Sequence, residues 1–278
     1  MKILVRLLSL TSIVLGIALP FGSTYAADTS AWVEDSYSAI RLVSGTSNST
    51  GSLLGGIEIK MKPGWHTYWR YPGDSGVPPR FSFAGSDNVA DAKVLFPAPH
   101  SFTDETGTTI GYKESVIFPV RIRAQQKGKP VTLRAKIDYA VCAKLCVPSE
   151  ARLELTIPPN GSADNAALDA AASLVPKLVS AAEAGLTVKR TDSPKTKPLV
   201  LVDLSAPAGK PVDLFVEGPS PEWSLPIPQP APGAPPGHRR FGFELDGLPP
   251  GTDPKGSYAL TFTIVTGGRA TEVKTHLD

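Results

Sequence analysis

Cysteine is scarce in this chain, and long hydrophobic runs are missing after its first residues. Only two cysteines occur among 278 residues, at Cys142 and Cys146, so a fold stapled by several disulfides is excluded. Beyond Ala26 no stretch approaches the roughly 18 apolar residues of a membrane-spanning helix. Direct membrane insertion of the mature chain is therefore not expected.

Net charge is also missing once the start of the chain is set aside. Lys2 and Arg6 precede an apolar stretch over residues 7–19, and small residues lead up to Ala26, a pattern typical of a secretory signal. Removal of that signal leaves 26 basic and 26 acidic side chains. This balance excludes the basic surface of a nucleic-acid-binding protein. We expect a mature chain that starts at Ala27 and is exported to a bacterial periplasm.

Helix-favouring composition is missing too, because proline and glycine together make up 53 of the 278 residues. Short strands joined by tight turns suit such a composition better than long helices. Alternating apolar and polar residues predict strands at 37–43, 53–61, 116–123, 131–141 and 151–157. This spacing predicts a mainly all-β fold that begins with an immunoglobulin-like β-sandwich over residues 27–160.

The remainder of the chain predicts a helical linker and a second, smaller β domain. Residues 161–185 form the expected linker, with a helix over 163–184 that Pro176 kinks or divides and Gly185 ends. The second domain covers 186–278. Its predicted strands lie at 199–204, 212–217, 240–245, 258–265 and 270–276. A proline-rich loop over 219–237 is expected to be extended.

The spacing of the two cysteines requires a turn between them. Residues four apart in a strand are separated by about 13 Å, whereas a disulfide needs α-carbons within about 7 Å. The chain therefore turns either as a hairpin tip or as one helical turn. Because residues 143–145 contain neither Gly nor Pro, a loop wider than a tight primed turn is favoured. Two thiols this close in an oxidising compartment indicate redox chemistry, with the disulfide itself as the reactive group and no other cofactor.

A structural disulfide and a copper site are the alternatives. A loop of about five residues gives only about 2 kcal/mol of stability, although a non-catalytic adaptor could still carry such a bond. Two thiolates and one imidazole would suit the copper of a copper-binding chaperone. The histidines that could complete such a site are His66, His100, His238 and His276. None of them lies in a ligand-spaced pair, so no metal is expected.

Three stretches of the first domain carry distinctive motifs. They are PGWHTYWRYPGDSG at 63–76, FPAPHSFTDE at 96–105 with its continuation to 120, and YAVCAKLCVP at 139–148. In this order and spacing they resemble the N-terminal periplasmic domain of the DsbD family of thiol:disulfide interchange proteins, especially its ScsB-like branch. The second β domain is similar to the extra domain of that branch.

The resemblance implies an immunoglobulin-like fold whose cysteine pair relays electrons as a protein-disulfide reductase component. The electrons would come from a separate membrane-embedded thiol reductase or a thioredoxin-like domain. They would pass to periplasmic thioredoxin-fold proteins of the disulfide isomerase or cytochrome c maturation type. The family pattern makes Cys146 the sulfur that forms mixed disulfides and Cys142 the resolving sulfur. This chain would then be one module of a relay whose other parts are separate proteins.

The resemblance also implies a loop that covers the sulfurs. Phe102 and Tyr112 lie in the matching segment, and Asp104 or Glu105 stands where the family places acidic residues that could handle protons. Lys144, between the sulfurs, would favour the thiolate by its charge.

Aromatic residues are concentrated just before the first turn-rich segment. Trp65, Tyr68, Trp69 and Tyr71 lie within seven positions. Packing in the sandwich core is the expected role of this cluster, and partner contact through Trp65 and Trp69 is the alternative.

Overall fold

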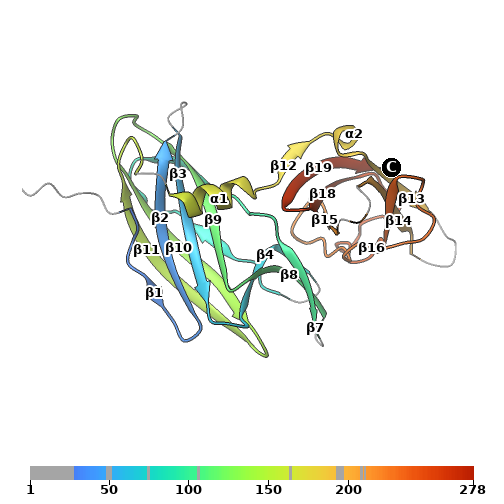
Figure 1. Ribbon diagram of the computed structural model, residues 1–278, viewed down its shortest axis with the longest axis horizontal. Coiled ribbons are helices and arrows are strands. Elements are labelled where there is room, and N and C mark those ends of the chain that lie inside the picture. Colours follow the sequence, from blue (N-terminus) through green and yellow to red (C-terminus); the bar gives the residue numbers. More distant parts are fainter. Residues whose placement is uncertain are drawn as a thin grey trace, which may run out of the picture.

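The computed structural model (Figure 1) shows two β domains side by side, joined by a short connection that contains a helix. It describes residues 28–47, 52–73, 76–104, 107–162, 165–191, 197–206, 209 and 211–278. The predicted signal at residues 1–26 lies outside the described residues. The mainly all-β fold class is confirmed.

The first domain is a sandwich of two sheets. One sheet has the order β1 (Val33–Glu34), β2 (Ser38–Ser47), β3 (Ser52–Met61), β9 (Ser115–Ala124) and β6 (Val89–Val94). The other has the order β11 (Cys146–Ile157), β10 (Val131–Cys142), β4 (His66–Gly73), β8 (Gly107–Lys113) and β7 (His100–Asp104), with β5 (Arg80–Ser82) paired to β10. Each predicted strand of this domain is present, but β11 begins at Cys146 rather than at 151.

The period of two in these strands explains their burial. Alternate residues of β10 and β11 are buried and enter one hydrophobic core, whereas the residues between them are mostly partly or fully exposed. The buried members are Val131, Leu133, Ala135, Ile137, Tyr139 and Val141 of β10 and Ala151, Leu153, Leu155 and Ile157 of β11. From the facing sheet Phe118, with no exposed surface, packs edge-on against Tyr112. The two long strands are thereby fixed as a rigid hairpin.

The second domain has its own core between two sheets. One sheet has the order β12 (Lys177–Val179), β19 (Arg269–Leu277), β18 (Tyr258–Thr266) and β15 (Val212–Glu217). The other has the order β13 (Leu186–Thr191), β14 (Leu199–Ser205), β17 (His238–Glu244) and β16 (Gln229–Pro230). The proline-rich segment 219–237 contains the two-residue strand β16 and turns at 221–222 and 236–237, so it is less extended than predicted.

The connection between the domains differs from the predicted continuous helix. Helix α1 (Ala166–Ser173) ends before Pro176, the chain then forms β12, and α2 (Ala181–Ala184) is a single turn. Pro176 cannot donate a helical hydrogen bond, and residues 177–179 pair in parallel with β19 instead. Gly185 ends α2 in the left-handed conformation, as predicted.

The first part of the connection packs on the first domain and the rest on the second. Leu168 of α1 has no exposed surface and lies where a side chain at Gly45 or Gly56 would collide with it at 2.8 Å. Helix α1 therefore packs on the first domain, whereas β12 and α2 extend the second (Figure 1). The connection is not a free linker.

Candidate functional site

The two cysteines form a disulfide at the tip of the β10–β11 hairpin. Cys142 is the last residue of β10, and Cys146 is the first residue of β11. The two pair with each other, and their α-carbons are 4.1 Å apart. Residues 143–145 close the tip, with the Ala143 amide donating to the Leu145 carbonyl at 3.1 Å. The predicted turn is thus a hairpin tip, and its three-residue loop is wider than a two-residue primed turn.

The two sulfurs have different surroundings. Cys142 is 1% exposed and clusters with Tyr68 and Ala140, whereas Cys146 is exposed. Exchange requires an incoming thiolate to approach one sulfur along the line of the disulfide bond. Cys146 is therefore the sulfur that a partner can reach, and Cys142 is the sulfur that stays inside.

A buried tyrosine contacts both sulfurs. The Tyr68 hydroxyl donates to Cys142 Sγ at 2.7 Å and lies 3.2 Å from Cys146 Sγ. Its ring is 2% exposed, and a side chain at Gly76 would meet it at 2.5 Å. Gly111, paired with Tyr68 across β4 and β8, also has no room for a side chain, because Thr67 O lies 2.1 Å from the position of its Cβ. Two glycines therefore allow the chain to close tightly around Tyr68.

This role of Tyr68 was not predicted from the sequence, which placed it only in an aromatic cluster. The missing information is the pairing of β4 with β10. These strands share the single register pair Cys142 and His66, and Thr67 Oγ1 donates to the Ala140 carbonyl at 2.8 Å. Alternation along β4 then brings Tyr68 beside the sulfurs.

The predicted covering residues lie in different places. Phe102, on the β7–β8 hairpin, is half-buried and meets the His66 ring edge-on at 4.7 Å, with Lys113 Nζ 4.7 Å from its own ring. His66 in turn meets Tyr68 edge-on at 5.5 Å, so Phe102 is connected to the disulfide through two aromatic contacts. The Asp104 side chain and Glu105 lie outside the described residues.

Tyr112, the other residue predicted to cover the sulfurs, packs in the core of the sandwich. Tyr112 is 6% exposed, belongs to the sandwich core and donates its hydroxyl hydrogen to the Pro97 carbonyl at 2.8 Å. Burial raises the pKa of Tyr112 well above its usual value, an effect that the Arg70 charge only partly opposes. It is a packing residue on the opposite side of β8 from Gly111.

The two tryptophans support packing rather than docking. Trp65 is half-buried and stacks on Tyr37 with ring centroids 4.0 Å apart. Trp69 has no exposed surface and packs against Phe215 of the second domain with ring centroids 5.7 Å apart, in line with the expected role in packing. Lys144 is exposed in the loop between the sulfurs, as expected of a turn residue.

Metal binding has limited support in the described residues. They contain no group of three or more His, Cys, Asp and Glu side chains placed to hold an ion. His66 is nevertheless the one predicted ligand that pairs in register with Cys142. Within the same part of the chain, no helix is long and apolar enough to cross a membrane.

A β-sandwich with a half-exposed disulfide at a hairpin tip, backed by a tyrosine, defines a candidate thiol–disulfide exchange domain. Residues 41–158 match the family described as thiol:disulfide interchange protein DsbD, N-terminal, so the resemblance read from the motifs is confirmed over this segment.

A solved structure shares the fold of nearly the whole chain. The crystal structure of the N-terminal periplasmic domain of ScsB from Proteus mirabilis matches with a TM-score of 0.67 and 20% sequence identity. The match covers 90% of this chain and 98% of that one, so the two-domain arrangement has a precedent. No curated protein matches the chain.

Proposed function

We propose that this protein is a periplasmic thiol–disulfide exchange module. It takes electrons from a membrane-embedded or thioredoxin-like reductase and passes them to periplasmic thioredoxin-fold proteins of the disulfide isomerase or cytochrome c maturation type. The observation that carries the proposal is the unequal burial of the bonded pair, Cys142 inside and Cys146 outside. The match to the DsbD N-terminal family and the signal-like N-terminus support the reaction and the compartment.

Reduction of the pair begins at Cys146. A partner thiolate attacks Cys146 Sγ, a partner–Cys146 disulfide forms, and the Cys142–Cys146 bond breaks. Cys142 leaves as a thiolate, and the Tyr68 hydroxyl, already 2.7 Å away, donates to it. Because a leaving thiol of lower pKa leaves faster, this hydrogen bond accelerates the step. The second thiol of the partner then attacks the partner's own sulfur in the mixed disulfide, so the partner leaves with a disulfide and Cys142 and Cys146 are left as two thiols.

Delivery of electrons uses the same atoms in reverse. The Cys146 thiolate attacks the disulfide of a thioredoxin-fold acceptor and forms a mixed disulfide. Cys142 then attacks Cys146 Sγ, the intramolecular bond returns, and the acceptor leaves as a dithiol. Two electrons and two protons pass from one protein to the other, so the reaction requires no further cofactor.

Trapping of mixed disulfides tests the proposal. Cys142→Ser removes the resolving thiol, and the Cys146 thiolate of the variant should attack the disulfide of an oxidised thioredoxin-fold protein and accumulate as a mixed disulfide with it. Cys146→Ser is the matched control and should trap far less, because Cys142 is buried. Trapping only through Cys142 would reverse the assigned roles.

Two results would replace the proposal with one of its alternatives. If neither variant traps a partner, the bond is structural and the protein is a non-catalytic adaptor. A tight one-to-one Cu(I) complex of the reduced protein, lost in His66→Ala, would instead favour a copper-binding chaperone. A relay protein should bind Cu(I) no better than a generic dithiol.

A further inference from the structure

Strand β4 runs from the disulfide to the second domain. Its Tyr68 contacts both sulfurs, and the next three residues each contact the second domain. The pairing of β4 with β8 shifts register between Tyr68 and Gly73, and this irregular stretch holds Trp69, Arg70 and Tyr71. A bulge of this kind re-aims side chains and is common beside active sites. Four successive residues thus connect the reactive bond to the neighbouring domain.

The second domain offers an outer sheet face to β4. Leu214 and Val216 of β15 enter the core of the second domain, and the alternate residues Phe215 and Glu217 point away from it. Phe215, only 1% exposed, is part of the first domain's core. At Phe215, and at the partly buried Val265 of β18, the outer face of the sheet is therefore packed against the first domain.

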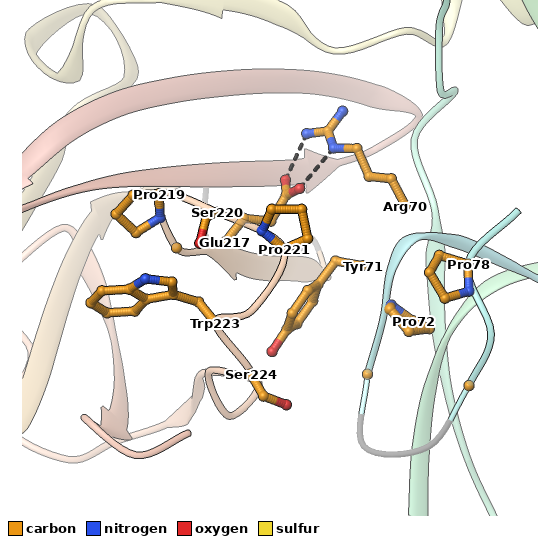
Figure 2. Close-up of a pocket in the computed structure, with 13 residues that line it drawn as sticks. Arg70, Tyr71, Pro72, Pro78, Glu217, Pro219, Ser220, Pro221, Trp223 and Ser224 are labelled. Carbon is orange, nitrogen blue, oxygen red and sulfur yellow. Dashed lines mark hydrogen bonds and ion pairs between the residues drawn. The ribbon is translucent and has the colours of Figure 1, made fainter. Parts of the chain in front are cut away.

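Arg70 holds this contact by charge. Its Nε donates to Glu217 Oε1 at 2.8 Å and its Nη2 donates to Glu217 Oε2 at 2.7 Å (Figure 2). The same Nη2 also donates to Glu272 Oε2 at 2.6 Å. Burial acts to lower the pKa of Arg70, but the hydrogen bonds and charges of both carboxylates outweigh it and raise the pKa. The guanidinium therefore remains charged and fixed in a two-carboxylate clamp.

Residues that follow Arg70 in the sequence connect the second domain to Tyr68 by a second route. The Tyr71 hydroxyl donates to the Leu225 carbonyl, and Tyr71 lines a pocket of about 520 Å³ between the domains together with Trp223 (Figure 2). Gly76 lines the same pocket and packs on the Tyr68 ring, where a Cβ would come within 2.5 Å. The interdomain contact therefore reaches Tyr68 in two ways. Arg70 lies two positions further along the same strand, and Gly76 packs on the Tyr68 ring.

We propose that Arg70 is a positioning residue through which the second domain holds Tyr68 against the sulfurs and thereby sets the rate of disulfide exchange. The second domain has no cysteine and contributes no reactive group. Its part in exchange is to fix the β4 segment that carries the hydroxyl donor. This inference rests on the proposed function and adds that the second domain controls the rate of exchange at that site.

The test compares two arginines that each make a two-pronged pair with one carboxylate, Arg70 with Glu217 and Arg240 with Asp203. Arg70→Gln removes the clamp between domains, and Arg240→Gln removes the Arg240–Asp203 pair, also two-pronged with both distances 2.7 Å, inside the second domain. The rate of Cys142–Cys146 reduction by dithiothreitol is measured on the full chain. We expect Arg70→Gln to slow reduction several-fold, Arg70→Lys to recover much of the rate, and Arg240→Gln to leave it unchanged.

A second comparison separates positioning from loss of stability. In a Tyr68→Phe background the hydroxyl is gone, so Arg70→Gln should slow reduction no further. If Arg70→Gln does not fold, Glu217→Gln replaces it in the test. This variant leaves Glu272 to pair with Arg70, so it should slow reduction less than loss of Arg70 would.

Three results would overturn the inference: an unchanged rate in a folded Arg70→Gln variant, an equal loss in Arg240→Gln, or a full additional loss in the Tyr68→Phe background. Failure of the proposed function appears differently, because the Cys142→Ser variant would then trap no partner through Cys146 whatever stands at position 70.

Discussion

One long hairpin from each domain, β10–β11 of the first and β18–β19 of the second, can be compared, and the two close in different ways. The β18–β19 hairpin turns at Gly267 and Gly268, both with positive φ of 55° and 79°, as a two-residue primed turn requires. The β10–β11 hairpin has no glycine at its tip and carries the Cys142–Cys146 bond there. A hairpin of similar regularity therefore forms in this chain without a covalent bond.

The difference indicates that pairing of the β10 and β11 strands does not depend on the disulfide. The bond spans only five residues, so its loop-closure contribution is about 2 kcal/mol, in a hairpin whose register pairs already run from Val131 to Ile157. What the bond adds is a reactive group at an exposed tip. The sandwich supplies the support and the hairpin tip supplies the chemistry.

The largest expected effect sharpens this comparison at the disulfide. Tyr68→Phe removes the hydrogen bond to the leaving Cys142 thiolate, and a hydrogen bond to a charged group contributes about 1.5–3 kcal/mol, so the reduction rate should fall roughly 10- to 100-fold. Tyr258→Phe, which loses a hydroxyl contact to the Asp253 carbonyl in the second domain, is the matched control. Stopped-flow measurement of thiol release gives the rate of each variant, and Tyr258→Phe should keep the parent rate. If Tyr68→Phe keeps it too, Tyr68 has no part in exchange.

The next effect concerns the stability that the bond supplies. Reduction of the pair should lower the free energy of unfolding by about 2 kcal/mol, the value for a short closed loop. Gly268→Ala, in the unlinked hairpin, should cost about 1 kcal/mol because its Cβ has room but its φ is left-handed. Urea unfolding of oxidised, reduced and substituted protein measures both. A loss well above 4 kcal/mol on reduction would indicate a bond with a mainly structural purpose.

The smallest expected effect depends on pH and concerns Asp35, which lies between β1 and β2 at the start of the first domain. Burial acts to raise the pKa of Asp35, but hydrogen bonds from Ser149 Oγ and the amides of Tyr37 and Ser38 outweigh it and lower the pKa. A lowered folded-state pKa gives stability that is present above the unfolded pKa and is lost as the pH falls through the folded pKa.

Asp35→Asn should therefore cost about 1 kcal/mol at pH 7, and its difference from the parent should shrink below about pH 4. Glu34→Gln, an exposed neighbour on β1, should change little at either pH. Chemical denaturation at several pH values measures the difference. A cost that stays constant down to pH 2 would show that the carboxylate charge is not involved.

Local patterns in the sequence predicted most of the strands and the turn at the cysteines. Period-two alternation located β10, and the four-residue spacing required a turn, because both are properties of short segments. The helix over 163–184 was predicted too long, since alanine-rich sequence favours helix locally whereas residues 177–179 gain pairing with β19, almost a hundred residues away.

The immediate surroundings of the disulfide were less predictable. Tyr68 reaches Cys142 only through the register of β4 on β10, and Arg70 meets Glu217 and Glu272 only after two domains have docked. Such contacts between distant segments leave no periodic signal in a single sequence. The spacing of the cysteines located the candidate pair, but the family motifs did not predict that Tyr112 packs in the core, because a match over a segment does not state which face of β8 a residue occupies.

The reduction potential of the Cys142–Cys146 pair tests the central claim most directly. The oxidised protein is equilibrated with defined ratios of reduced and oxidised dithiothreitol or glutathione, and free thiols are counted by alkylation and mass spectrometry. A relay disulfide should equilibrate reversibly at roughly −180 to −270 mV, in the range of thiol–disulfide exchange proteins. A potential well below about −300 mV, where structural disulfides of exported proteins lie, would contradict the relay.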